Sequence, residues 1–89
     1  MTVSQMIAEL QQDLRASDEP LLLEGLLARR ATRAAIIVLF LAVLELIRLE
    51  AVIAVQQEAF GPVLLRKHKL FDVVFARPGK IAAIDTQYL

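Results

Sequence analysis

Few side chains in this 89-residue sequence could do covalent or acid–base chemistry. They are one histidine, His68, and two serines, Ser4 and Ser17, and the sequence contains no cysteine. A hydrolytic or transfer site needs a nucleophile with a base within hydrogen-bond reach. His68 lies between Lys67 and Lys69, as expected for a solvated strand end. We therefore assign His68 no catalytic or ligand role.

The other polar residues also lack the spacing of a cofactor or metal site. The sequence has no glycine-rich phosphate loop, which would supply the backbone amides that hold nucleotide phosphates. Its acidic residues are scattered along predicted helices rather than gathered as cation ligands. We therefore expect a non-enzymatic protein without a cofactor or a metal.

Two basic clusters raise the question of nucleic-acid binding. The first comprises Arg29, Arg30 and Arg33, and the second comprises Arg66, Lys67 and Lys69. However, ten basic residues balance ten acidic ones, so no overall field attracts a polyanion. Short charge runs are more often solvated faces. The alternative function is a DNA-binding or transcription-regulating domain in which Arg66 and the first cluster hold phosphates.

The first structural element is predicted from helical periodicity near the N-terminus. Apolar residues recur at intervals of three and four over residues 3–16, which predicts a helix with one buried face. Thr2 and Gln5 match a capping box, which satisfies the first free amides of the helix. Pro20 prevents continuation, because proline lacks an amide hydrogen and disfavours helical geometry in the preceding residue.

A third helix is predicted over residues 32–49, with Thr32 as its N-cap and no proline or glycine inside it. Before it, residues 21–23 are predicted to form a short strand, followed by a second helix that ends near Arg30.

The uncharged run at residues 34–44 is shorter than the roughly 20 residues that span a bilayer. We expect no membrane partner, although a membrane-associated protein built on this helix is a third alternative. The N-terminus lacks the features of a signal peptide.

A β-hairpin is predicted after the third helix. Two β-prone runs, residues 52–57 and 62–67, flank a loop that contains Gly61. Three helices followed by a hairpin is the order of a winged helix, in which residues near Leu22 supply a third strand. We therefore predict a mainly α fold with a small antiparallel β-hairpin, a winged helix of three helices plus wing, over residues 1–67. A chain of 57% hydrophobic residues is expected to fold.

The C-terminal tail, residues 68–89, is predicted separately from the winged helix. Within it, residues 71–76 and residues 80–85 flank a turn that contains Pro78 and Gly79. Proline followed by glycine favours type II turn geometry. This pattern predicts a second hairpin in the tail.

The third helix has more apolar residues than one buried face requires. The predicted core stripe comprises Ile36, Ile37, Leu39, Phe40, Val43, Leu44 and Ile47. Ala35, Val38 and Ala42 lie largely outside this stripe, and Glu45 is expected to remain solvated. The cover for the second face could be the first helix and the tail, a second copy in a homodimer, or a different protein. Val38 and Ala42 are therefore candidate partner-binding residues.

One stretch of the sequence resembles a known family. It reads FLAVLELIRL from Phe40 to Leu49 and continues through Val52 to QEAFG at residues 57–61. This pattern is similar to the C-terminal signature of the segregation and condensation protein A family, whose third helix reads FLA-hydrophobic-LEL and whose wing ends in Gln-x-x-x-Phe-Gly, a spacing that Gln56, Phe60 and Gly61 fit here. The resemblance extends more loosely over residues 3–66.

The resemblance implies a partner. Proteins of this family are kleisins, which bridge the two heads of an SMC dimer together with an accessory segregation protein and close a ring around DNA. Their C-terminal winged helix docks on one SMC ATPase head. For this chain the resemblance implies a cytoplasmic, nucleoid-associated module that binds an SMC head. The regions that contact the SMC neck and the accessory segregation protein are absent here, so we expect a fragment that bridges nothing and contacts DNA indirectly at most.

Residues of the wing are the first candidates for the partner interface. A hairpin edge with an apolar tip can add to a partner's sheet, which favours Phe60 and Val63. Phe60 packed as a core cap under the wing is the alternative, and Gly61 is expected to supply a positive φ. The sequence departs from the family at Glu50, where glycine is usual, and at Pro62, where an acidic residue is usual. Both positions are predicted to lie at turns.

Overall fold

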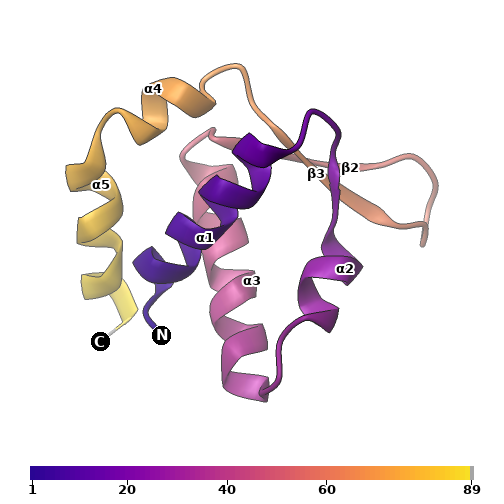
Figure 1. Cartoon of the computed structure of the whole chain (residues 1–89), viewed down its shortest axis with the longest axis horizontal. Coiled ribbons are helices and arrows are strands. Elements are labelled where there is room, and N and C mark those ends of the chain that lie inside the picture. Colours follow the sequence, from indigo (N-terminus) through magenta and orange to yellow (C-terminus); the bar gives the residue numbers. More distant parts are fainter. Residues whose placement is uncertain (89) are drawn as a thin grey trace.

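The chain is described by a computed structural model that covers residues 1–88 apart from the side chain of Pro78. Its elements are α1 (Val3–Ala16), β1 (Leu21–Leu22), α2 (Leu23–Ala28), α3 (Arg33–Arg48), β2 (Val52–Gln56), β3 (Val63–Lys67), α4 (Phe71–Phe75), α5 (Pro78–Ala82) and the 3-10 helix η1 (Ala83–Tyr88) (Figure 1). The fold is mainly helical with a small antiparallel sheet, as predicted. The first six elements follow the order of a winged helix.

Side-chain caps set the starts of the two long helices. The Thr2 hydroxyl accepts from the Gln5 amide at 3.1 Å, and the Gln5 side chain accepts from the Thr2 amide at 2.8 Å. At the start of α3, the Thr32 hydroxyl accepts from the Ala35 amide at 3.1 Å. Both predicted caps are confirmed, and each satisfies an amide that has no partner within its helix.

The end of α3 is closed by a residue in left-handed geometry. Glu50 has a φ of 64°, and its amide donates to the carbonyl of Ile47 at 3.0 Å. The next amide, that of Ala51, donates to the carbonyl of Leu46 at 2.9 Å. These two bonds are the Schellman pattern, in which glycine commonly holds the left-handed position. The turn leads the chain directly into β2.

The three strands form an antiparallel sheet in the order β1-β3-β2. β3 is central, pairing Leu21 with Leu65 on one side and Gln56 with Val63 on the other. The predicted hairpin and the third strand near Leu22 are therefore confirmed. β2 is an edge strand, and the hairpin of β2 and β3 extends away from the helices as the wing (Figure 1).

The core lies between α1 and α3 and under the sheet. Its fully buried large side chains are Met6, Ile7, Leu10, Leu39, Leu46, Leu65 and Ile84. The membership of Ile84 shows that the tail packs on the same core as the winged helix. Phe71 is also buried, with 3% of its surface exposed. The two ends of the chain meet, because the Ser4 amide donates to Asp85 Oδ1 at 2.8 Å.

The prediction of a second hairpin in the tail is wrong. The residues expected to form two strands are helical in α4, α5 and η1. Phe71 and Phe75 lie one helical turn apart with ring centroids 4.7 Å from each other, a contact that a strand does not offer. Pro78 begins α5, where the missing amide hydrogen of proline costs nothing. The proline therefore starts a helix, and no turn between strands forms there.

Candidate partner-binding surfaces

The residues considered for catalysis, His68, Ser4 and Ser17, each make separate local hydrogen bonds. His68 Nδ1 accepts from the Leu70 amide at 2.9 Å. The Ser4 hydroxyl donates to Asp85, and the Ser17 hydroxyl donates to a backbone carbonyl two residues later at 2.8 Å. Among residues 1–88, no hydrogen bond joins the histidine to either serine. The fold does not assemble them into one site.

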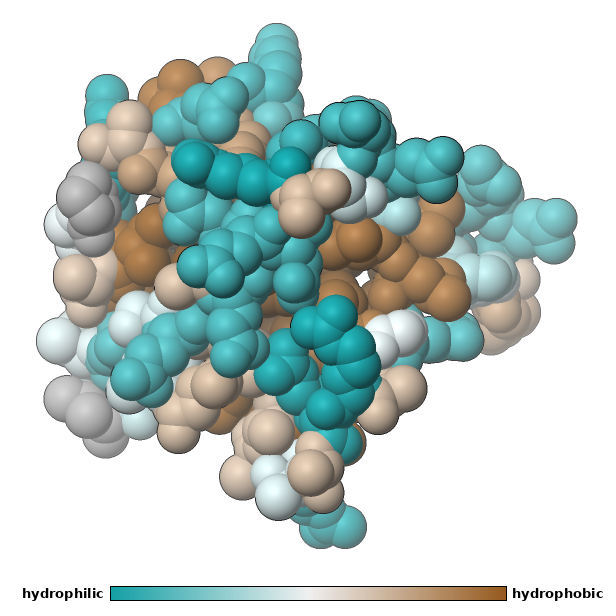
Figure 2. Space-filling view, in the orientation of Figure 1, coloured by the Kyte–Doolittle hydropathy of each residue, from teal (hydrophilic) through white to brown (hydrophobic). Residues whose placement is uncertain are grey.

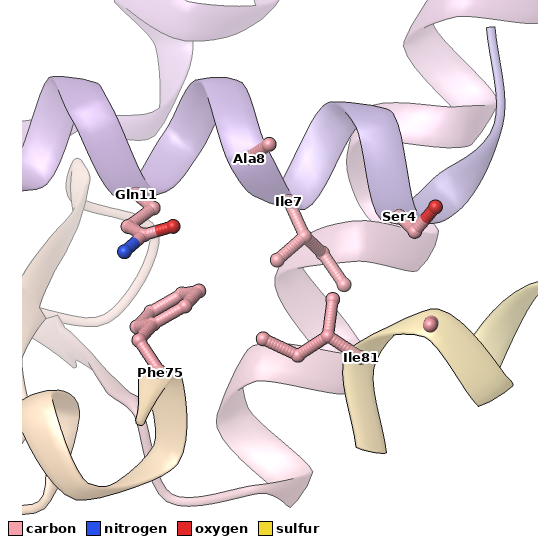
Figure 3. Close-up of a pocket in the computed structure, with 7 residues that line it drawn as sticks. Ser4, Ile7, Ala8, Gln11, Phe75 and Ile81 are labelled. Carbon is pink, nitrogen blue, oxygen red and sulfur yellow. The ribbon is translucent and has the colours of Figure 1, made fainter. Parts of the chain in front are cut away.

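A hollow of about 250 Å³ lies between α1 and the tail. Figure 3 shows Ile7 and Ile81 pointing toward one another across it, with Phe75 opposite Gln11. In Figure 2 apolar surface shows on both sides of the hydrophilic outer face of α1, one side being toward the tail. Small-molecule sites usually exceed about 300 Å³ and contain converging polar groups. The hydroxyl of Ser4 is already bonded to Asp85, so we assign this hollow no ligand.

The first basic cluster is largely neutralised. Arg29 Nη2 lies 3.2 Å from Asp13 Oδ2, and Arg30 Nη1 lies 3.0 Å from Glu9 Oε2. These ion pairs attach the end of α2 to α1, and the Arg30 side chain is only 12% exposed. A phosphate would have to displace an acidic partner from Arg29 and from Arg30. Arg66 and its lysine neighbours on and after β3 are exposed.

The exposed face of α3 differs from the predicted one. Four residues expected in the core are instead exposed: Ile37 (51%), Phe40 (43%), Leu44 (59%) and Ile47 (37%). We call these four residues the α3 stripe. Ala42, predicted to bind a partner, is fully buried, and Val38 is half-buried. The small side chain of Ala42 permits close approach of α1, which therefore packs on the side that carries Leu39, Ala42 and Leu46.

The α3 stripe is unsuited to reading DNA. A recognition helix presents polar and cationic side chains to base edges and phosphates. Here the exposed face of the corresponding helix is apolar between Arg33 and Arg48. The guanidinium of Arg48 is bonded to Glu45, with Nε 3.0 Å from Oε2. This face matches an apolar protein partner better than a polyanion.

Glu45, expected to be solvated, is 6% exposed. Tyr88 of η1 donates its hydroxyl proton to Glu45 Oε1 at 2.6 Å, and Arg48 donates to Oε2. Burial alone would raise the pKa of Glu45, but the hydrogen bonds from Arg48 and Tyr88 outweigh it and lower this pKa below its ordinary value. The same contact raises the pKa of Tyr88. The tail thus covers the Glu45 side of α3 and leaves the α3 stripe exposed.

The tip of the wing displays an aromatic ring to solvent. Phe60 is 103% exposed and has a φ of 63°. Packing of Phe60 as a core cap is therefore wrong. Gly61, expected to have the positive φ, does not have it. A Cβ on Gly61 would lie 3.1 Å from the Glu58 carbonyl oxygen, so this close approach explains the glycine.

Hydrogen bonds hold the wing tip in this shape. The Gln56 side chain donates to the Gly61 carbonyl at 2.7 Å, and the Gly61 amide donates to the Glu58 carbonyl at 3.0 Å. Val63 follows at the start of β3, half-buried and paired with Gln56. Of the four predicted interface residues, Phe60 is fully accessible, Val63 and Val38 are partly accessible, and Ala42 is not.

Comparisons with known proteins identify no relative: no family model matches the chain, and no curated protein or solved structure matches it significantly. Within residues 1–88, no helix has both the length and the apolar character needed to cross a membrane.

Proposed function

We propose that this chain is a non-enzymatic binding module that docks through its wing on the ATPase head of an SMC protein. The observation that carries the proposal is the display of Phe60 at the wing tip, fully exposed and in left-handed geometry. A non-glycine residue in this geometry costs free energy, and such strain clusters at binding sites. Aromatic side chains are also frequent anchors of protein interfaces. The SMC head is proposed from the sequence resemblance.

The edge of the wing supports the same proposal. Among residues 1–88, β2 pairs only with β3, so its other side is a sheet edge whose backbone donors and acceptors can bond a partner strand. In such strand addition, main-chain hydrogen bonds supply affinity and a side chain in a pocket supplies specificity. Phe60 would fill that pocket, with Val63 beside it. ATP chemistry would belong to the SMC partner, and this chain would act in chromosome condensation and segregation at the nucleoid.

The competing DNA-binding function receives less support. Arg29 and Arg30, two of the four arginines it needs, are in ion pairs with acidic residues of α1. The exposed face of α3 is apolar where base contacts would be made. DNA binding is therefore the alternative, and titration with a short DNA duplex tests it.

A calorimetric titration with an SMC ATPase head tests the proposal. Phe60→Ala should weaken head binding at least tenfold, or about 1.4 kcal/mol, because the anchor is lost. It should change the free energy of unfolding by less than about 0.5 kcal/mol, since the ring makes no core contact. Val73→Ala on α4, which also truncates an exposed apolar side chain (51%), is the control and should bind as the wild type does. Equal binding by Phe60→Ala would contradict the proposal.

A further inference from the structure

The α3 stripe is an apolar surface that the wing-docking proposal does not use. Each of its four side chains has more than a third of its surface exposed, and all four lie on one side of a single helix. A stripe of this size is comparable to the largest apolar patch of a typical monomeric protein, and such a patch is often a binding surface. None of its residues belongs to β2, β3 or the wing tip.

We propose that a second copy of this chain covers the α3 stripe in an antiparallel homodimer. The stripe residues follow the spacing three, four, three, which is the seam spacing of two packed helices. This spacing is symmetric about position 42. When two α3 helices lie antiparallel, Ile37 therefore faces the partner's Ile47, and Phe40 faces the partner's Leu44. A twofold interface requires such self-complementarity.

Charges at the ends of the stripe favour the antiparallel arrangement. Arg33 lies one helical turn before Ile37, and no salt bridge holds it within the described part of the chain. In the antiparallel dimer it lies beside the C-terminal end of the partner's α3, where the helix dipole is negative and the exposed Glu50 follows. A parallel dimer would place Arg33 against Arg33 and Arg48 against Arg48. The charge of Arg48 is already balanced by Glu45.

The area of the stripe sets the expected strength of the dimer. Its exposed apolar surface is on the order of 300–400 Å², whereas a stable complex buries about 800 Å² on each partner. The dimer should therefore be weak, with a Kd of roughly 10–500 µM. Sedimentation equilibrium between about 5 and 1,000 µM spans this range.

Leu44→Arg tests whether the stripe forms the contact. Leu44 is the most exposed residue of the stripe (59%) and faces the centre of the proposed interface, so a charge there should weaken the dimer at least tenfold without unfolding the chain. Val73→Arg adds the same charge at an exposed apolar position of α4 and should leave the Kd unchanged. Circular dichroism checks that both variants are folded. A wild-type chain that is monomeric throughout, or a Leu44→Arg variant that still dimerises, would overturn the proposal.

Engineered cysteines test the direction of the contact, because the natural sequence has none. A mixture of Phe40→Cys and Leu44→Cys chains should form the 40–44 disulfide at least tenfold faster than the 40–40 or 44–44 disulfide. Preference for disulfides between identical positions would overturn the antiparallel arrangement.

The dimer and the SMC-head proposal fail independently. Phe60→Ala should leave dimerisation intact, and Leu44→Arg should leave head binding intact, if each surface has the partner assigned to it. If the wild type is monomeric and Leu44→Arg instead abolishes head binding, the stripe belongs to the head interface and the homodimer is wrong.

Discussion

Among residues 1–88, two non-glycine residues, Glu50 and Phe60, have left-handed backbone geometry, and their surroundings differ. Glu50 closes α3 through two backbone hydrogen bonds made by its own amide and that of Ala51. The left-handed geometry of Glu50 therefore serves to end the helix. Phe60 lies at the tip of the wing turn, and its ring packs against no other residue in the described part of the chain. In the proposed docking, this strained geometry presents the ring to the partner.

Glu50→Gly should stabilise the chain. Glycine adopts a φ of 64° without the steric cost that Glu50 bears, although it also gains freedom in the unfolded state. We expect the free energy of unfolding to rise by about 0.5–1 kcal/mol in urea denaturation. Glu50→Ala is the control, because it removes the side chain while keeping the strain. A glycine variant less stable than the alanine variant would show that the turn does not have this geometry.

Single residues were predicted well where the cause is local. The caps at Thr2 and Thr32 depend on neighbours three residues away, and both form as predicted. Glu45 was predicted poorly, because the Tyr88 hydroxyl that buries it lies 43 residues away in sequence. The family that the sequence resembles usually has glycine at the position of Glu50. Glycine is the residue that the positive φ at this position favours.

At the scale of elements, η1 is attached to α3 through the bond from Tyr88 to Glu45. Tyr88→Phe keeps the ring and removes only the hydroxyl. The loss should lower the free energy of unfolding by about 1 kcal/mol, because Glu45 retains its bonds to Arg48 but loses one donor. Thermal or urea unfolding measures this change. Unchanged stability would mean that solvent replaces the hydroxyl at no cost.

Acid should weaken the attachment of the tail. The pKa of Glu45 in the folded chain lies below its ordinary value of 4.5, and hydrogen bonds from Ser4 hold the pKa of Asp85 below 3.8. Groups with a lowered folded pKa contribute stability above their ordinary pKa and lose it as the pH falls through the folded value. Urea midpoints should therefore decrease between pH 5 and pH 2, and by less in Tyr88→Phe. A midpoint that rises over this interval would contradict these contacts.

The sequence does not predict correctly which face of α3 is buried. Apolar residues occur almost all around the helix, so periodicity alone cannot decide which of them face the core. The choice depends on α1, which packs against Ala42 and leaves Leu44 exposed. The α3 stripe was missed because its spacing is the same as that of a buried face.

For the whole molecule, the tail and the winged helix share one core. Ile84 is 1% exposed and packs with residues of α1 and α3. Ile84→Ala should therefore lower the free energy of unfolding of the entire chain by about 2–4 kcal/mol. Circular dichroism should show one unfolding transition, shifted as a whole. A separate early transition, with the winged helix unaffected, would mean that the tail folds independently.

The helical tail could not be predicted from its local pattern. The Pro78-Gly79 pair is compatible both with a turn between strands and with the start of a helix. Burial of Ile84 against α1, together with burial of Phe71 under the Arg15 guanidinium of α1, selects the helix. These contacts join opposite ends of the sequence.

We propose that this chain recognises a protein partner through Phe60 at the tip of its wing and does not recognise nucleic acid through charge. Calorimetric titrations against an SMC ATPase head and against a short DNA duplex, each at about 50 and 200 mM salt, test it directly. We predict head binding with a Kd near or below about 1 µM that changes less than about threefold with salt, and no DNA binding at the higher salt. DNA binding that falls steeply with salt, together with no binding to the head, would contradict the claim.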